Sequence, residues 1–180
     1  MDADSHAHPA VTRHDASRDI TEQGQHMPNL SLFSNNLPDY FIIDHTGEAD
    51  IAKIETDEDR RNATFEWTGR LRIGETGQLR RAIGPLGFCL RIATFSNFRM
   101  HSKYFEGIRD PEVAEEVRGD STFALEAAEI DPNQLSFRSV KFPDRFIRHR
   151  DYQLYAEPVR FPPELQSACF RIAAPLSEGF

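Results

Sequence analysis

Apolar and polar residues alternate along most of the chain from residue 30 onward. Apolar pairs spaced two residues apart are Leu30/Leu32, Phe65/Trp67, Phe123/Leu125, Leu135/Phe137 and Phe170/Ile172. Because successive side chains of a strand point to opposite faces, this spacing predicts half-buried β-strands. Proline and glycine turn signals separate the segments, so the pattern predicts an all-β domain.

One stretch of this pattern recurs. Residues 30–43 (LSLFSNNLPDYFII) match residues 135–148 (LSFRSVKFPDRFIR), and a degenerate copy occupies residues 79–91. Each copy closes on a second apolar segment, at residues 63–67, 121–125 and 168–172. Repetition of this kind indicates one supersecondary unit built three times, because one unit cannot bury its apolar face alone. We therefore expect a β-trefoil with three pseudo-repeats, at about residues 29–74, 75–130 and 131–176.

Each closing segment carries a phenylalanine at the same place in its copy. We expect Phe65, Phe123 and Phe170 to be equivalent and buried in the barrel. Cys89 and Cys169 also occupy apolar strand contexts and are expected to be buried thiols, although the sequence leaves open whether they pair.

The second copy is longer than the other two and contains the clearest helix signal. Asp110, Pro111 and Glu112 suit the N-cap, the first position and the first turn of a helix. We expect one short helical insertion there, ended by Gly119. In the first copy, residues 55–61 suit either a helical turn or a solvated loop.

Composition changes this picture at the N-terminus. Residues 1–28 contain no apolar run and more acidic than basic side chains, which predicts a loosely attached tail before a single domain at residues 29–180. The sequence shows neither a basic start followed by an apolar segment nor a span of membrane length. We expect a cytoplasmic protein with no membrane partner.

Charge and motif content narrow the functional classes. A net charge of −8 argues against a nucleic-acid partner, since such partners require a basic face. The sequence contains no metal-spaced cysteines, phosphate-binding glycine loop or Ser-His-Asp order, so no cofactor or metal is expected. Whether the chain is an enzyme stays open; acid–base groups available for chemistry on a small molecule are His101, His149, Asp120 and Glu157.

The third copy, at residues 135–155, resembles the arabinofuranose-binding (AbfB-type) domain of α-L-arabinofuranosidases. The resemblance extends over about residues 29–176 and is strongest in the third copy. It implies a β-trefoil with one pocket per unit, which binds arabinofuranose side chains without catalysis.

The resemblance also implies which residues form each pocket: a histidine after the strand arginine, an aspartate before the closing segment, and neighbouring aromatics. In the third copy His149 matches the histidine, with Asp151 and Tyr152 beside it, but Ser167 replaces the acid. We expect Glu157 to supply that carboxylate, if its strand turns it toward His149.

The other two copies are also incomplete. Asp120 matches the acid of the second copy, whose histidine position falls near Ile92, and the first copy offers Asp44 or His45 with Asn62 in place of the acid. The pockets are therefore expected to be degenerate. The candidate carbohydrate-binding residues are His149, Asp151, Tyr152, Glu157, Asp120 and His45.

Three functions remain open from the sequence. The first is binding of a pentofuranose-type carbohydrate. The second is an intracellular trefoil repurposed to bind or transform a small metabolite, with Phe95, Phe98, Tyr104 and Phe105 as walls of an apolar pocket. The third is a protein-interaction module that docks through the helix of the second copy. The oligomeric state is undetermined.

Overall fold

The computed structural model describes residues 29–45 and 47–178, so the N-terminal tail predicted for residues 1–28 lies outside the described residues. The described part is an all-β fold with few helices, as the alternation predicts, and its strands form one sheet. The strands are β1 (Asn29–Ser34), β2 (Phe41–His45), β3 (Glu48–Ala52), β4 (Phe65–Trp67), β5 (Thr76–Gly77), β6 (Leu79–Arg81), β7 (Phe88–Ala93), β8 (Arg99–Tyr104), β9 (Phe123–Ala127), β10 (Leu135–Ser139), β11 (Phe146–Arg150), β12 (Gln153–Glu157) and β13 (Phe170–Ala173).

The sheet closes on itself. β1 pairs with β4, β4 with β6, β5 with β9, β9 with β10, β10 with β13, and β13 returns to β1, all antiparallel. Only Gln78 separates β5 from β6, so these two short strands carry the ring continuously from β4 to β9. A closed ring leaves no exposed sheet edge and encloses one core.

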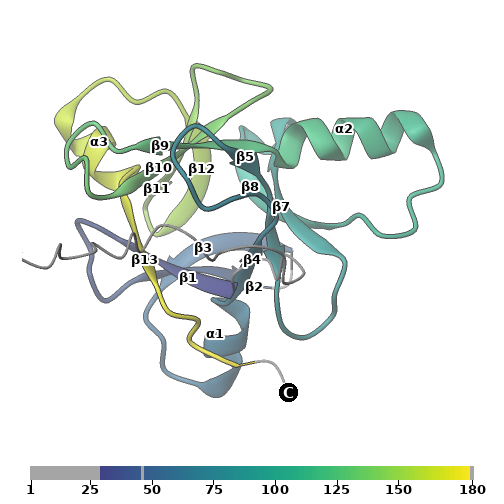
Figure 1. Ribbon diagram of the computed structural model, residues 1–180, viewed down its shortest axis with the longest axis horizontal. Helices are drawn as coiled ribbons and strands as arrows, with labels where there is room; N and C mark the ends of the chain where they lie inside the picture. The colour runs from purple at the N-terminus through teal and green to yellow at the C-terminus, as the bar shows by residue number, and fades with distance from the viewer. Residues whose placement is uncertain (1–28, 46, 179–180) are drawn as a thin grey trace, which may run out of the picture.

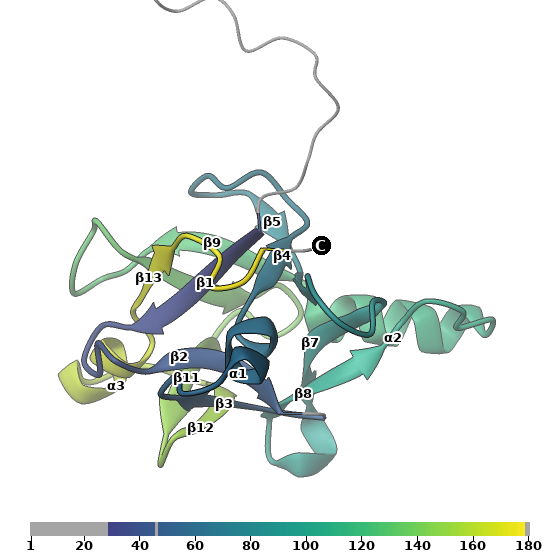
Figure 2. The same cartoon turned by 90° about the horizontal axis from the view of Figure 1, so that it is seen from below.

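Three hairpins, β2–β3, β7–β8 and β11–β12, meet one another beside this ring. β3 pairs with β8, β12 with β3, and β12 with β8. In Figure 2, β3, β8, β11 and β12 lie toward the lower side and β1, β4, β5, β9 and β13 toward the upper side; Figure 1 gives the perpendicular view. The hairpins therefore cover one end of the ring.

A buried arginine joins the three hairpins. Arg99 of β8 is 6% exposed, and its Nη2 lies 2.5 Å from the Asp50 carboxylate of β3 and 3.4 Å from that of Glu48. Its guanidinium also lies 5.4 Å from the ring centre of Tyr155 in β12. Arg99 thus contacts both the β2–β3 and the β11–β12 hairpin, and the carboxylates of Asp50 and Glu48 offset the desolvation free energy of its buried charge.

Aromatic side chains fill the ring. Phe65, Phe123 and Phe170 are each 0% exposed, which confirms that the three closing phenylalanines are buried. Trp67 and Phe170 both contact the ring of Phe137, with centroids 5.8 and 6.2 Å away. Edge-to-face aromatic contacts of this kind add to the free energy gained from burial alone.

Two glycines make room for the indole of Trp67. A Cβ atom at Gly77 would lie 2.6 Å from the Trp67 ring, and one at Gly69 would lie 2.1 Å from the carbonyl oxygen of Thr76. Any larger side chain at either position would force Trp67 or the backbone to move. The closure between β5 and β9 therefore depends on backbone passing directly beside a buried ring.

The described residues contain three α-helices where the sequence predicts one: α1 (Asp57–Asn62), α2 (Pro111–Ser121) and α3 (Pro162–Ser167). α2 confirms the helical insertion predicted in the second copy, and α1 overlaps residues 55–61, where the sequence left a helical turn or a loop open; only α3 was not predicted. α1 begins with a capping box, in which Thr56 and Asp59 each bind the other's backbone N–H. The Glu164 carboxylate of α3 accepts from the backbone N–H groups of Arg160 and Phe161. One-turn helices of this kind depend on end capping, because they are too short to show a periodic apolar face.

α2 begins as predicted and ends later than predicted. Asp110 accepts hydrogen bonds from the N–H groups of Glu112 and Val113, and Pro111 is the first helical residue. The helix continues through Gly119 to Ser121, because Val117, Asp120 and Ser121 are buried and anchor its last turn. A Cβ at Gly119 would lie 3.3 Å from the Lys141 side chain, so the glycine instead allows Lys141 to pass close to the helix.

Both cysteines are buried and free. Burial raises the pKa of both thiols, that of Cys169 to about 11. Neither thiol is therefore suited to act as a thiolate nucleophile near neutral pH. Within residues 29–45 and 47–178, no helix is long and apolar enough to cross a membrane.

The packing of Phe170 gives a stability prediction. Phe170→Ala would leave a cavity beside Phe137, so we expect a loss of about 3–5 kcal/mol in the free energy of unfolding. Phe161→Ala removes a ring that is 63% exposed and should cost less than about 0.5 kcal/mol. Urea denaturation of both variants measures the difference, and equal losses would contradict the assignment of Phe170 to the core.

Candidate functional site

The first of three buried polar clusters joins β2, the end of α1 and β6. The Arg81 Nε atom lies 3.4 Å from Oδ2 of Asp44, and Arg81 Nη2 donates to the side-chain oxygen of Asn62. Burial raises the pKa of Asp44, although the charge of Arg81 opposes the rise. The Asp44 carboxylate and the Asn62 side-chain oxygen could accept hydrogen bonds from ligand hydroxyl groups, but both face Arg81.

The second cluster surrounds Asp120, which is 2% exposed at the end of α2. Lys141 Nζ lies 2.7 Å from one carboxylate oxygen, and Arg91 Nη1 of β7 lies 3.6 Å from the other. Both oxygens therefore face a cation supplied by the chain itself. A sugar diol could bind Asp120 only by displacing one of these partners.

The third cluster contains His149 of β11. Its Nε2 atom lies 2.9 Å from both the Ser34 hydroxyl and the Asn36 side-chain oxygen, which belong to β1 and the loop after it. Burial, aided by the charge of Arg148, lowers the pKa of His149 to about 4. The imidazole is thus neutral near neutral pH, and its Nε2 is engaged with residues more than 110 positions away in sequence.

The expectation that Glu157 turns toward His149 is wrong. In the β11–β12 ladder His149 is opposite Leu154, whereas Glu157 is opposite Phe146. Glu157 therefore lies on the other face of the hairpin, where its carboxylate is 3.1 Å from Arg150 and 3.7 Å from Arg148. The strand register separates the two groups, since neighbouring positions alternate between faces. The hydroxyl of Ser167 donates to the backbone of its own helix, to the oxygen of Glu164 at 2.9 Å.

An open cleft of 440 Å³ lies where the tip of the β11–β12 hairpin meets the first hairpin and α1. Its floor includes the rings of Tyr40 and Tyr152, stacked with centroids 5.3 Å apart and planes 28° apart. The turn at Asp151 and Tyr152 has positive φ angles of 53° and 63°, which presents Tyr152 toward Tyr40. The backbone of Ile51 in β3 holds this turn by donating to the carbonyl of Tyr152 at 2.8 Å.

Polar groups surround the tyrosine pair. His45, Glu55 and Asp59 line the cleft, and the ammonium of Lys53 lies 5.6 Å from the Tyr40 ring centre. One Asp59 oxygen caps α1, and the bonds from Thr56 lower the pKa of that carboxyl group. Glu55 and His45 are exposed. Aromatic rings beside hydroxyl acceptors and donors suit a polyhydroxylated ligand with apolar C–H faces.

The structure brings together only part of the predicted set. His45 and Tyr152 line the same cleft, and Asp151 adjoins it on the same turn. Asp120 and His149 lie in separate buried clusters, and Glu157 lies on another face.

Sequence reasoning missed Tyr40, Glu55 and Asp59 of this cleft. Tyr40 follows the Leu-Pro-Asp turn of the first copy, where the third copy has Arg145. An aromatic in place of a charged residue at a turn was an available signal.

The four aromatics proposed to wall one apolar pocket are dispersed. Phe95 is 76% exposed at the turn between β7 and β8, with its ring 5.8 Å from that of His101. Phe98 packs against Arg145, whose guanidinium lies 3.5 Å from the ring centre. Tyr104 contacts Phe88, and Phe105 lines a different cavity.

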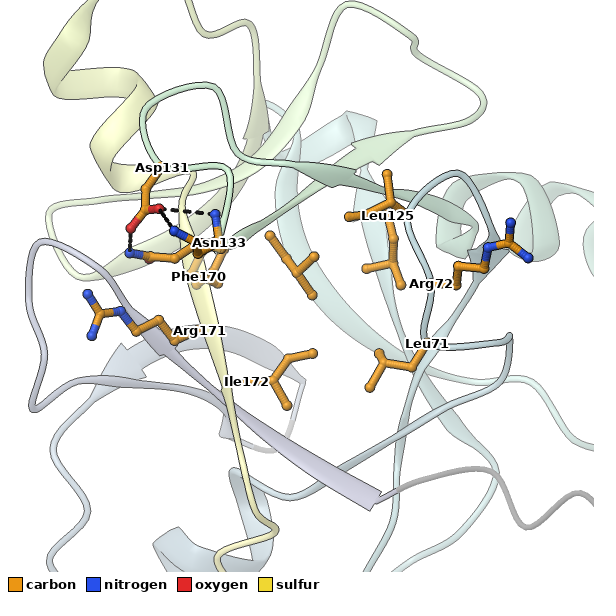
Figure 3. A pocket seen from close by; sticks show the side chains of 11 residues that line it. Leu71, Arg72, Leu125, Asp131, Asn133, Phe170, Arg171 and Ile172 are labelled. Atoms are coloured by element: carbon orange, nitrogen blue, oxygen red, sulfur yellow. Dashed lines mark hydrogen bonds between the residues drawn. The ribbon is translucent and has the colours of Figure 1, made fainter. Parts of the chain in front are cut away.

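A cavity of 570 Å³ opens between the β4–β5 loop, the β9–β10 loop and β13 (Figure 3). Leu71, Leu125 and Ile172 supply apolar walls, and Figure 3 shows Arg72 and Arg171 on opposite sides of the apolar centre. Asp131 accepts hydrogen bonds from Asn133 and Gln134, as the dashed lines show. None of the six predicted site residues lines this cavity.

Among the residues that the structure describes, no group of three or more His, Cys, Asp or Glu side chains could hold a metal ion.

Comparison with known proteins agrees with the sequence resemblance. The family model of the alpha-L-arabinofuranosidase B (ABFB) domain matches residues 93–172. That range contains Asp120, His149 and Tyr152 and excludes β1 to β6. No curated protein matches the chain.

Solved structures resemble the chain over most of its length. An arabinofuranosidase complexed with arabinofuranosyl-α-1,2-xylobiose matches with a TM-score of 0.68 and 18% identity, over 84% of this chain and 32% of that protein. BEL beta-trefoil, in an apo crystal form, matches with a TM-score of 0.58 and 12% identity, over 86% of this chain and 95% of that one. An endo-β-galactosidase from Clostridium perfringens matches with a TM-score of 0.58 and 12% identity, over 81% and 32%. The chain spans about a third of the arabinofuranosidase, and likeness at these identities concerns the fold alone.

The buried state of His149 predicts a pH effect on stability. Its pKa falls from 6.5 to about 4 on folding, so between these values the unfolded chain binds a proton that the folded chain does not. Stability should fall as the pH drops through this window, by up to about 3 kcal/mol from this residue. His149→Gln should reduce that dependence.

Urea unfolding at about pH 7 and about pH 4.5 measures the effect. His45→Gln is the control, since it removes an exposed histidine without touching the cluster. An unchanged pH dependence in His149→Gln would contradict the role of burial.

Proposed function

We propose that the chain is a carbohydrate-binding β-trefoil with three units at about residues 29–74, 75–130 and 131–176. The family match at residues 93–172 and the likeness to arabinofuranosidase and beta-trefoil structures support this proposal. The order of elements supports it too, since a strand, a hairpin, a helix and a second strand follow one another in each unit. The ring strands and three contacting hairpins fit such an arrangement, with β5 and β6 together taking the place of one strand in the second unit.

The observation that carries the binding proposal is the open cleft at Tyr40 and Tyr152. It combines aromatic surface with His45 and Glu55, whose exposed groups can bind sugar hydroxyls. The Tyr152 side chain, 56% exposed, offers a ring for the C–H face of a sugar. A pentofuranoside is the ligand class to test first, because it is the one the family match suggests.

The three buried clusters are less suited to binding a sugar than the open cleft is. Asp120 and His149 are already hydrogen-bonded, to Lys141 and Asn36, whereas Asp44 Oδ2 faces Arg81 Nε at 3.4 Å and is held by charge alone. A ligand entering the Asp120 or His149 cluster would have to replace these hydrogen bonds, and one entering the Asp44 cluster would have to compete with the buried charge of Arg81. We infer that they are degenerate pockets that now join neighbouring units, and that the open cleft binds the sugar.

Titration with methyl α-L-arabinofuranoside tests the proposal. We expect a dissociation constant near the millimolar range, which corresponds to about 4 kcal/mol. Tyr152→Ala should weaken binding about tenfold, because it removes the ring that covers the sugar face. Tyr152→Phe keeps that ring and should retain most of the affinity.

The matched control is Phe95→Ala, which removes another exposed aromatic at a hairpin turn outside the cleft. It should bind like the unmodified chain. Equal binding by Tyr152→Ala, or no binding by the unmodified chain at tens of millimolar, about ten times the expected constant, would refute the proposal.

A repurposed trefoil that binds a small metabolite is the second candidate function. The 570 Å³ cavity of Figure 3 favours it, because its volume and apolar walls suit a small ligand. Ile172→Glu would place a charge in that cavity, at a side chain already 38% exposed.

A metabolite bound in this cavity should raise the thermal midpoint of the unmodified chain and not that of Ile172→Glu. Arabinofuranoside binding should be the same in both proteins. A midpoint rise retained in Ile172→Glu would place the metabolite elsewhere.

A further inference from the structure

A separate cavity of 480 Å³ lies between α2 and the strands β5 and β6. Its lining comes from four parts of the chain: the β4–β5 loop, β5–β6, the loop after β8, and α2. It contains no residue of the tyrosine cleft and none of the six sequence-predicted site residues.

Arg80 of β6 is held in a fixed orientation at this cavity. Its guanidinium lies over the ring of Phe105, 4.3 Å from the ring centre. Its Nε and Nη2 atoms donate to the side-chain oxygen of Gln78 at 3.2 and 2.9 Å. Two of the five N–H groups of the guanidinium are thus used, and within the described residues Nη1 has no hydrogen-bond partner.

The residue that orients Arg80 is itself fixed at both ends. The amide nitrogen of Gln78 donates to the Ser121 hydroxyl at 2.6 Å, and its backbone N–H donates to the Thr68 hydroxyl at 2.9 Å. Ser121 in turn donates to the carbonyl of Val117 in α2 at 2.7 Å. This chain of bonds orients the guanidinium before any ligand arrives, so little rotamer freedom is lost on binding.

The charged residues around the cavity suit a ligand that carries a single negative charge. Arg118, the other cation in the lining, is 2.7 Å from Glu115 and is thereby compensated. Glu66 lies opposite Arg80 in the β4–β6 ladder, yet no ion pair joins them in the described part of the chain. Arg80 therefore presents one uncompensated positive charge, and its planar fork matches the two oxygens of a carboxylate.

The remaining lining is mixed. Thr68 and Thr76 bring hydroxyl groups, and Ile108 and Val117 bring aliphatic surface. Hydroxyl partners beside apolar surface suit a ring that carries both C–H faces and hydroxyl groups. We propose that this cavity binds a sugar acid of the hexuronate class, with its carboxylate on Arg80 and its ring against Ile108 and Val117. This site does not depend on the proposed function of the tyrosine cleft.

Titration of the full chain with galacturonate tests the proposed site, and galactose, which lacks the carboxylate, is the uncharged control ligand. Both are measured in the Tyr152→Ala background, so that the tyrosine cleft does not contribute. Galacturonate should bind at least about tenfold more tightly than galactose, since a hydrogen-bonded ion pair contributes about 1.5–3 kcal/mol. Added salt should weaken galacturonate binding and leave galactose unchanged.

Two variants separate binding from folding. Arg80→Gln should lower galacturonate affinity about tenfold or more, and Arg80→Lys should recover only part of it, because an ammonium lacks the fork. Thr76→Glu changes an exposed lining residue and should abolish binding through charge repulsion without disturbing the core. Arg60→Gln, the loss of an ion-paired cation on α1 outside this cavity, should bind normally.

Urea unfolding verifies that each variant is folded. Galacturonate binding that equals galactose binding overturns the proposal. So does undiminished galacturonate binding in a folded Arg80→Gln or Thr76→Glu variant.

Discussion

Closure of the sheet is the constraint on which the rest of this structure depends. The ring is completed by a two-residue strand, β5, against β9, and a third residue, Gln78, separates it from β6. This contact requires Gly77, because any Cβ there would collide with Trp67. Once the ring is closed, the aromatic side chains of Phe65, Phe123 and Phe170 have a common interior in which to be buried. Without closure, the ends of the sheet would be exposed edges and the core would be open to water.

Closure also decides where polar groups come together. The three junctions contain Asp44, Asp120 and His149 with their partners, and the ends of α1 and α2 take part in the first two. Groups buried at such junctions must be compensated, and the chain compensates them itself through Arg81, Lys141 and Asn36. These clusters consequently join segments far apart in sequence. Open surface with suitable chemistry remains at the tyrosine cleft and beside Arg80.

The exact short helices and the charge pairs could not be predicted from the sequence, for different physical reasons. α1 and α3 are six residues long, so their capping residues rather than a periodic apolar face define them. Gly119 reads as a helix stop in sequence, but burial of the last turn of α2 offsets its low helix propensity of about 1 kcal/mol. Lys141 is 21 positions from Asp120, and nothing in the local sequence indicates that the two side chains meet.

The sequence by itself determined the all-β class and the burial of the closing phenylalanines. Both follow from local alternation, since the period of two fixes which side chains share a face whatever the strands pair with. It also placed Tyr152 and His45 among the candidates, through their positions in related segments. Only the tertiary structure decided that these two residues share a cleft with Tyr40, that Glu157 faces away from His149, and that Asp120 is occupied by Lys141 and Arg91. Those outcomes depend on strand register and on contacts across the closed ring, and neither is encoded in the spacing of residues within one segment.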